Sequence, residues 1–386
     1  METKLTTLDV ISWGGFVMFA ASSVITPICL PEIAKTFDTT FAESGGMETV
    51  RTLVILVMLL LAGICAQKWG KKPFLTSGQY LLAAGLFLIS MAQSYPMLLA
   101  FLMIIGIGGG FSEALINPLV VDLHPQDSGK YLNLTNAFYS IGVMAAALLF
   151  GELLTLGYSW RWIFRLAALG ALLVSLLFTF ARFPAAAENP RSPWHTMGRI
   201  LIMPGFWLFA AAIFLGAGVE SALTFWSRSY VETYLQTAPR AGAVAVVMFA
   251  GAMAGGRLLS ARLAKTMGLK NMMLASALLG LAAGGIIPLA TNLGWFYVLL
   301  ALAGLATACF WPTILAEAAA SLKADATILF AMLACIGIAG FGFAPWLMGL
   351  IGDRLDLRTG FAVIPAFFVL LILVLMLERR VSEAQR

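Results

Sequence analysis

The sequence predicts an all-α membrane protein with twelve transmembrane helices in two six-helix bundles, and three observations support this fold class. Of the 386 residues, 61% are hydrophobic and only 11% are charged, a balance that a water-soluble surface does not tolerate. The apolar residues form charge-poor stretches of about 20 residues, the length a helix needs to cross the hydrocarbon core of a bilayer. The second half of the chain also repeats short motifs of the first half.

The predicted helices follow the apolar stretches in chain order. Two apolar runs are too long for one crossing, and each is divided by turn residues, at 93–96 and at 291–294. The first run is as long as the others and lacks a small-residue cleavage site after a basic start, so we interpret it as a retained helix. The twelve expected spans are 9–31, 47–67, 73–93, 96–121, 131–156, 161–181, 201–228, 240–261, 270–290, 294–319, 326–351 and 358–378.

The longest polar interval between these helices is 182–200, which contains three prolines and charges of both signs. Six predicted helices precede it and six follow it. We therefore expect an N-terminal bundle over 1–181, a cytoplasmic linker over 182–200 and a C-terminal bundle over 201–386.

The distribution of Lys and Arg predicts that both termini lie in the cytoplasm, because positively charged loops stay on that side. With the N-terminus inside, sixteen of the 24 basic residues fall on the inner side and eight on the outer side. Topology and anionic lipid headgroups then explain the net charge of +5. We expect a lipid bilayer and a small solute as partners, no nucleic acid, and a monomer.

Enzyme chemistry is not indicated by any motif of the sequence. A glycine loop followed by Lys and Ser or Thr, which would bind phosphate, is absent. The residues that bind metals elsewhere lack ligand spacing here, so we expect no metal and no cofactor besides a coupling proton. These residues are Cys29, Cys65, Cys309, Cys335, His124 and His195, with the cysteines in helices and the histidines in cytoplasmic loops.

The two halves carry related motifs in the same order. The segment 63–72 follows the second predicted helix, and the similar segment 261–270 follows the eighth. The dipeptide Asn117-Pro118 of the fourth helix recurs as Trp311-Pro312 in the tenth. Membrane proteins built from such parallel repeats bind their substrate between the halves, near the bilayer midplane.

At these motifs the chain resembles the major facilitator superfamily. The segment 63–72 is similar to the superfamily's loop between helices 2 and 3, whose usual form is Gly-x-x-x-Asp-Arg-x-Gly-Arg-Arg/Lys, and 160–164 is similar to its entry to helix 6. The chain departs from the pattern at two positions, with Gln in place of Asp and Lys in place of Arg. The loop residues that carry the resemblance are Gly63, Gln67, Lys68, Gly70, Lys71 and Lys72.

Within the superfamily, the segments 108–118, 136–142 and 218–221 are similar to the fucose permease type of sugar:proton symporter. The resemblance implies a carrier in the inner membrane of a bacterium that couples solute uptake to protons. The fucose permease pattern places an acid in helix 1 shortly before a Leu-Pro pair. Here Leu30-Pro31 is preceded by Thr26-Pro27 and no nearby acid, so coupling would differ or be lost.

Glu113 is the predicted proton-coupling residue. An ionised carboxylate inside an apolar helix costs several kcal/mol unless it is paired or hydrated, so Glu113 should face a cavity. Gly106, Gly109, Gly110 and Asn117 share its helix face, where glycines permit close approach of a backbone or a ligand. The alternative is a carboxyl group that stays protonated and bonds a neighbouring helix permanently.

Substrate binding is assigned to polar and aromatic residues inside other predicted helices. Glu220 follows Gly216-Ala217-Gly218, where a bent helix would expose carbonyl groups, although it could also brace two helices. Asn136 and Tyr139 lie on a polar stripe suited to hydroxyl groups, and Arg51 could contact an anionic group or pair locally with Glu48. The aromatic residues of the set could stack on a sugar ring or only pack between helices. The complete predicted set is Glu220, Asn117, Asn136, Tyr139, Trp226, Trp311, Phe310 and Arg51.

These observations favour a secondary active transporter that moves a sugar or sugar derivative with a proton by alternating access. One alternative is a proton-driven exporter of drugs or metabolites. A second is a sensor or scaffold that keeps the fold without transporting.

Overall fold

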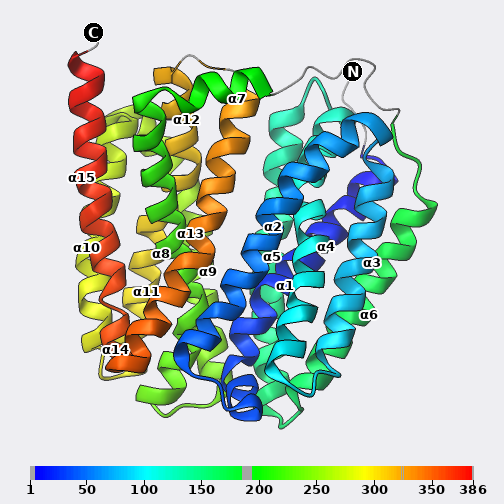
Figure 1. The fold of residues 1–386 in the computed structure, drawn as a ribbon. Helices are drawn as coiled ribbons and strands as arrows, with labels where there is room; N and C mark the ends of the chain where they lie inside the picture. Colours follow the sequence, from blue (N-terminus) through cyan, green and yellow to red (C-terminus); the bar gives the residue numbers. More distant parts are fainter. Residues whose placement is uncertain (1–4, 185–193, 323, 325, 385–386) are drawn as a thin grey trace. The chain divides into compact units, whose positions relative to one another are not determined.

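The computed structural model describes residues 5–184, 194–322, 324 and 326–384, and every regular element within them is helical (Figure 1). The all-α prediction is therefore confirmed. The helices are α1 Thr7–Phe37, α2 Phe41–Trp69, α3 Lys72–Ile89, α4 Tyr95–Leu123, α5 Ser128–Thr155, α6 Trp160–Phe180, α7 Trp194–Leu201, α8 Pro204–Tyr234, α9 Pro239–Met267, α10 Leu269–Ile286, η1 Ile287–Leu289, α11 Leu293–Thr307, α12 Phe310–Leu322, α13 Ala326–Arg354, α14 Leu357–Gly360 and α15 Val363–Ala384.

Eleven stretches of the described residues are long and apolar enough to cross a membrane, one fewer than expected. The predicted span 73–93 is the one that is not among them. Its helix, α3, has only 18 residues, begins at Lys72 and carries Gln79, so it is more polar than the other spans. The count of twelve crossings and the cytoplasmic termini remain predictions, while the multi-pass character is established.

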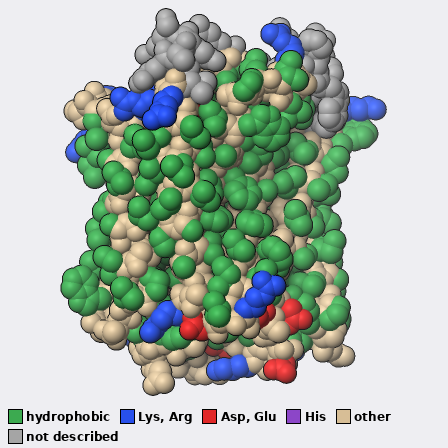
Figure 2. Space-filling view, turned by 60° about the vertical axis from the view of Figure 1, so that its left-hand side comes forward, with side chains coloured by type: hydrophobic (Ala, Val, Ile, Leu, Met, Phe, Trp, Pro, Cys, Tyr) green, Lys and Arg blue, Asp and Glu red, His purple; other side chains and the backbone are tan. Residues whose placement is uncertain are grey.

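Apolar side chains cover the middle of the surface drawn in Figure 2, and charged side chains gather toward its two ends. Long apolar side chains are exposed on many helices, including Leu173 of α6 and Leu258 of α9 at 56% and 75%. In water such a surface would aggregate, whereas in a bilayer it contacts acyl chains.

The chain divides into two compact units. Unit 1 consists of Met1–Thr39, Val50–Pro190 and Ala238–Val244, and unit 2 of Thr40–Thr49, Arg191–Thr237 and Ala245–Arg386. The middle of the predicted linker, 185–193, lies outside the described residues, and its last part, 194–200, belongs to α7.

Glycines set the close packing of α4 in unit 1. A Cβ atom at Gly106 would lie 2.8 Å from the carbonyl oxygen of Arg51 on α2. One at Gly108 would lie 2.7 Å from the backbone nitrogen of Leu82 on α3. Small residues of this kind let membrane helices approach until their backbones touch.

Unit 2 includes the first turns of α2 because Asp353, near the end of α13, caps them. Its carboxylate accepts hydrogen bonds from the N–H groups of Phe41 and Ala42 at 2.6 and 3.0 Å. These N–H groups have no partner inside their own helix, so a carboxylate at this position stabilises the helix start.

A buried polar cluster joins α1, α4 and α5 in unit 1. Asp9 accepts hydrogen bonds from the backbone N–H of Thr6 at 2.7 Å and makes a 2.8 Å hydrogen bond with Nε2 of His124. The His124 ring stacks on Tyr131 at 3.5 Å, and both Asp9 and His124 are fully buried. His124 is the first residue after α4, so it lies in the connection to α5 as a loop residue, but its side chain is buried against α1. The side chain of His195 lies outside the described residues.

Replacing Asp9 by Asn is expected to lower the free energy of unfolding by about 1–3 kcal/mol, since the change weakens the helix cap and a buried hydrogen bond together. The measurement is the thermal unfolding midpoint of the purified protein in detergent. Asp38→Asn is the control because Asp38 is exposed and has a φ of 51°, which Asn also tolerates. Equal midpoints for the two variants would contradict the structural role of Asp9.

Candidate functional site

Unit 1 brings three of the predicted site residues together on α4 and α5. Glu113 lies in the interior of α4, half-buried, and its carboxylate makes no hydrogen bond or ion pair with any described residue. Asn117 lies one turn further along, where its Oδ1 accepts a long hydrogen bond of 3.5 Å from Nδ2 of Asn136 on α5. The same Nδ2 donates to the carbonyl of Leu132 at 2.8 Å. A carboxyl group and two amides therefore occupy adjacent turns.

Aromatic rings connect this group to α1. The ring of Tyr139 lies 5.3 Å from Phe16 and 5.8 Å from Phe19, measured between centroids. The Phe19 ring in turn fills the space beside Gly109, where a Cβ atom would lie 2.9 Å from it. The residues of α1, α4 and α5 thus meet through Phe19.

The side chain of Arg51, on α2, contacts α1. It is 5% exposed, and its Nη1 donates to Oγ of Ser23 at 3.4 Å, one turn beyond Phe19. Arg51 thus places a positive charge inside unit 1. The free-energy cost of burying a charge is tolerable only when the group is paired or hydrated. Its contact with an anionic substrate remains a prediction.

The glycine face of α4 meets neighbouring helices. The backbone and side chains of α2 lie against Gly106 and Gly110, and Phe19 lies against Gly109. The glycines were expected to permit close approach of a backbone or of a ligand. At Gly106 and Gly110 the neighbour is the backbone of α2. Glu113 and Asn117, further along the helix, are the polar side chains of this face.

A buried amide that contacts Ser112, the residue before Glu113, was not among the predicted site residues. Gln79 of α3 is fully buried, and its Nε2 donates to Oγ of Ser112 at 2.9 Å. Its Oε1 atom has no hydrogen-bond partner among the described residues. The sequence does contain a lone glutamine within an apolar helix. Because burying an amide without a partner is costly, such a residue predicts a specific hydrogen bond or a ligand contact.

Unit 2 places Glu220 in an unbroken helix. α8 runs from Pro204 to Tyr234, and its glycines Gly216 and Gly218 pack against Phe310 and Phe367. The helix is therefore not interrupted beside Glu220. The break in unit 2 lies between α11 and α12, at 308–309, directly before Phe310 and Trp311. Pro312 lies in the first turn of α12, directly after this break.

Arg257 on α9 is a charged neighbour of Glu220 that was not among the predicted site residues. α9 continues to Met267, so Arg257 lies inside a candidate membrane span and not at its cytoplasmic end. Its positive charge acts electrostatically on the half-buried Glu220. The two side chains form no direct ion pair within the described part of the chain. A separated acid and base of this kind can hold a polar solute between them.

The three predicted aromatic contacts differ in accessibility. Trp226 is 1% exposed, and its Nε1 donates to the carbonyl of Pro345 at 3.0 Å. Phe310 is buried against Gly216 and Phe368. Both rings pack between helices because α8 and its neighbours approach closely. Only Trp311 remains half-exposed, edge-on to Phe341.

The loop motif at 63–72 forms an ion pair with Asp122 of α4, which lies outside the motif. Nζ of Lys71 donates to the carbonyl of Pro118 at 2.9 Å and forms an ion pair with Asp122 at the end of α4. Gly70 has a φ of 77°, which favours glycine, and Lys68 lies over the Trp69 ring. Gly63 has open space around it, and the side chain of Gln67 is outside the described set.

Comparison with known proteins agrees with this fold. The chain is 23% identical to membrane protein MosC of Rhizobium meliloti over 346 residues, which are 88% of this chain and 83% of MosC. It is 31% identical to the L-fucose-proton symporter of Escherichia coli over 145 residues, which are 36% of this chain and 33% of that protein. The structure of a bacterial homologue of the human lysosomal transporter Spinster superposes with a TM-score of 0.83 at 15% identity, covering 97% of this chain and 96% of the other.

The family follows from a match that covers nearly the whole sequence. Two overlapping segments, 11–289 and 230–386, match the profile of the Major Facilitator Superfamily. Proteins of this type are transporters and not enzymes. The chain therefore belongs to the Major Facilitator Superfamily.

Proposed function

We propose that this transporter carries a sugar or sugar derivative together with a proton, by alternating access, in the inner membrane of a bacterium. The observation that carries the proposal is Glu113, a half-buried carboxylate in the interior of α4 with no ion-pair partner among the described residues. Such a group is costly when ionised and becomes neutral on binding a proton. The partial similarity to the L-fucose-proton symporter supports the same substrate class.

The neighbouring residues supply the groups that a hydroxyl-rich solute requires. Asn117 and Asn136 each offer a donor and an acceptor, and Tyr139 offers a phenolic hydroxyl and a ring face. Considered by itself, unit 2 offers an acceptor at Glu220 and a half-exposed aromatic surface at Trp311. In this scheme, protonation of Glu113 removes a charge that would otherwise oppose closure of a dry cavity around the solute.

The test is a pH measurement on proteoliposomes that contain the purified protein and start with equal pH on both sides. Adding a transported sugar outside should make the external solution alkaline, because each proton enters with the solute. A protonophore should remove the signal, and protein-free liposomes should give none. The panel contains neutral sugars, sugar acids and lipophilic cations.

Each outcome of the panel leads to a different conclusion. Alkalinisation with a stereoselective set of sugars supports symport. A response only to lipophilic cations would contradict the proposal and favour proton-driven export. Sugar flux without a pH change would leave a carrier that is not coupled to protons.

A further inference from the structure

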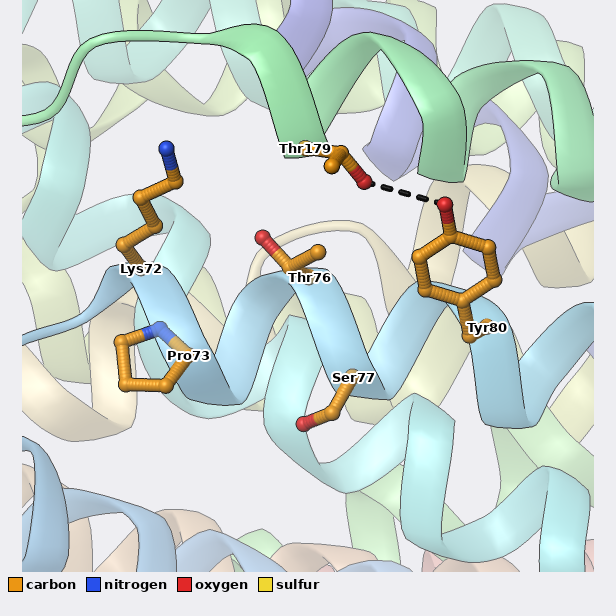
Figure 3. A pocket seen from close by; sticks show the side chains of 6 residues that line it. All are labelled: Lys72, Pro73, Thr76, Ser77, Tyr80 and Thr179. Atoms are coloured by element: carbon orange, nitrogen blue, oxygen red, sulfur yellow. Dashed lines mark hydrogen bonds between the residues drawn. The ribbon is translucent and has the colours of Figure 1, made fainter.

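A groove between α3 and α6 in unit 1 has no role in the proposed transport site. It has a volume of about 450 Å³ and is lined by Lys72, Pro73, Thr76, Ser77, Tyr80 and Thr179. α3 packs along α6, and the side chains of Lys72 and Thr76 point toward α6 (Figure 3). The groove lies where α3 begins and α6 ends, the level that the positive-inside rule assigns to the cytoplasmic side of the bilayer.

No carboxylate among the described residues balances the charge of Lys72. Its Nζ donates one hydrogen bond, to the carbonyl of Ala181 at 2.9 Å, and an ammonium group has three donors. Lys72 forms no ion pair with a described carboxylate. The adjacent Lys71 differs, because Asp122 neutralises it. Helix α6 contains no acidic residue that could serve Lys72.

Unit 2 contains the neutralised counterpart of this arrangement. α10 packs along α15 as α3 packs along α6, and Lys270 lies 198 positions after Lys72 in the repeat. Nζ of Lys270 contacts the carboxylate of Glu378 on α15 at 2.9 Å and that of Glu317 at 3.5 Å. Helix α6, which packs along α3, contains no acidic residue, whereas α15 supplies Glu378 to Lys270. At the end of α6, Phe180 is 82% exposed and precedes Ala181, whose carbonyl accepts the hydrogen bond from Lys72.

The other polar groups of the groove suit phosphate oxygens. The hydroxyl of Thr76 is buried and has no hydrogen-bond partner among the described residues. The hydroxyls of Tyr80 and Thr179 lie 3.0 Å apart and form a hydrogen bond (Figure 3). An ammonium group beside an unpaired hydroxyl can donate charge-assisted and neutral hydrogen bonds to the same anion.

Apolar surface continues from the groove along α6. Leu172, Leu176 and Phe180 are spaced four residues apart, so they share one helix face, and they are 41%, 41% and 82% exposed. This stripe provides a surface for an acyl chain next to a site for an anionic group. A soluble anion would not use it.

We propose that this groove is a binding site for an anionic phospholipid, with the headgroup phosphate held by Lys72 and Thr76 and an acyl chain along the exposed face of α6. Basic sites between membrane helices on the cytoplasmic side are suited to such headgroups. The lipid supplies unit 1 with the negative charge that Glu378 supplies to unit 2. The inference is independent of the transported substrate.

The test measures lipid retained by the purified full-length protein, by native mass spectrometry from detergent with phosphatidylglycerol or phosphatidylcholine. The unchanged protein should retain phosphatidylglycerol in preference to phosphatidylcholine. Lys72→Gln should bind phosphatidylglycerol about five-fold more weakly or worse, the effect expected for one basic residue at an anionic surface. Lys265→Gln, at the end of α9, removes the same charge elsewhere and should change binding little.

A second variant tests the charge argument without altering Lys72. Phe180→Glu places a carboxylate at the end of α6, next to Ala181, whose carbonyl accepts the hydrogen bond from Lys72, and the exposed ring contributes little packing to be lost. It should reduce phosphatidylglycerol retention as strongly as Lys72→Gln. Phe180→Gln, which adds no charge, should retain the lipid at a level close to that of the unchanged protein.

Three results would overturn the proposal. The first is equal retention of phosphatidylglycerol by the unchanged protein, Lys72→Gln and Phe180→Glu at matched unfolding midpoints. The second is equal retention of phosphatidylglycerol and phosphatidylcholine by the unchanged protein. The third is Lys72-dependent binding of inorganic phosphate that matches the lipid in affinity, which would assign the groove to a soluble anion.

Discussion

Glu113→Gln is expected to abolish uphill accumulation of the solute while counterflow exchange continues. Glutamine has the shape of a protonated glutamic acid but cannot take up or release a proton. The variant would therefore resemble the loaded, proton-bound carrier permanently, and exchange of solute needs only that form. Because Glu113 has no ion-pair partner among the described residues, its neutralisation leaves no opposite charge buried without its pair.

The measurement compares two assays on the same proteoliposomes, with a sugar identified by the pH panel. Accumulation is followed under an imposed pH gradient, and counterflow is followed without a gradient. Glu152→Gln is the control, because Glu152 is 43% exposed at its side chain and its 3.2 Å ion pair with Arg240 lies at the surface. Loss of both activities in Glu113→Gln would contradict a pure coupling role, and retention of accumulation would place proton binding elsewhere.

Gly108→Ala is expected to lower the unfolding midpoint strongly. The added methyl group would meet the backbone nitrogen of Leu82 at 2.7 Å and its Cα at 3.1 Å, and the carbonyl of Gly78 lies closer still. Backbone atoms cannot rotate away as a side chain can, so α3 and α4 would have to separate. Overpacking of this kind costs about 1–3 kcal/mol.

Gly63→Ala is the matched control for Gly108→Ala. It makes the same change within helix α2, where no atom lies within 4 Å of the added group. Alanine there gains up to about 1 kcal/mol of helix propensity, so the midpoint should stay the same or rise. Midpoints are compared in one detergent at one heating rate. A fall of equal size in both variants would show that close packing of α3 and α4 is not the cause.

The helices themselves follow from local features of the sequence. Long apolar stretches and the turn residues between them locate nearly every span, since hydropathy depends only on neighbouring residues. The break before Trp311-Pro312 was also foreseeable, because proline disturbs the helix that contains it. The predicted span that is not among the candidate membrane helices is α3, whose 18 residues include the polar Lys72 and Gln79.

The candidate site was only partly foreseeable. The cost of burying a carboxylate or an amide identifies Glu113, Glu220 and Asn136 from the sequence, whatever their partners are. The same reasoning applies to Gln79 and Arg257, but neither was among the residues predicted for the site. Aromatic residues carry no such cost, so nothing in the sequence separates the half-exposed Trp311 from the buried Trp226 and Phe310.

The membrane class, the apolar helices and the buried ionisable groups are properties of the residue order alone, because each depends on a residue and its near neighbours. The rotation of each helix and its partners depend on contacts between residues far apart in the chain. Those contacts join His124 to Asp9, set Arg257 near Glu220, and leave Lys72 without the carboxylate that Lys270 has. Only the packed structure could decide them, since membrane helices of similar hydropathy can turn different faces toward one another.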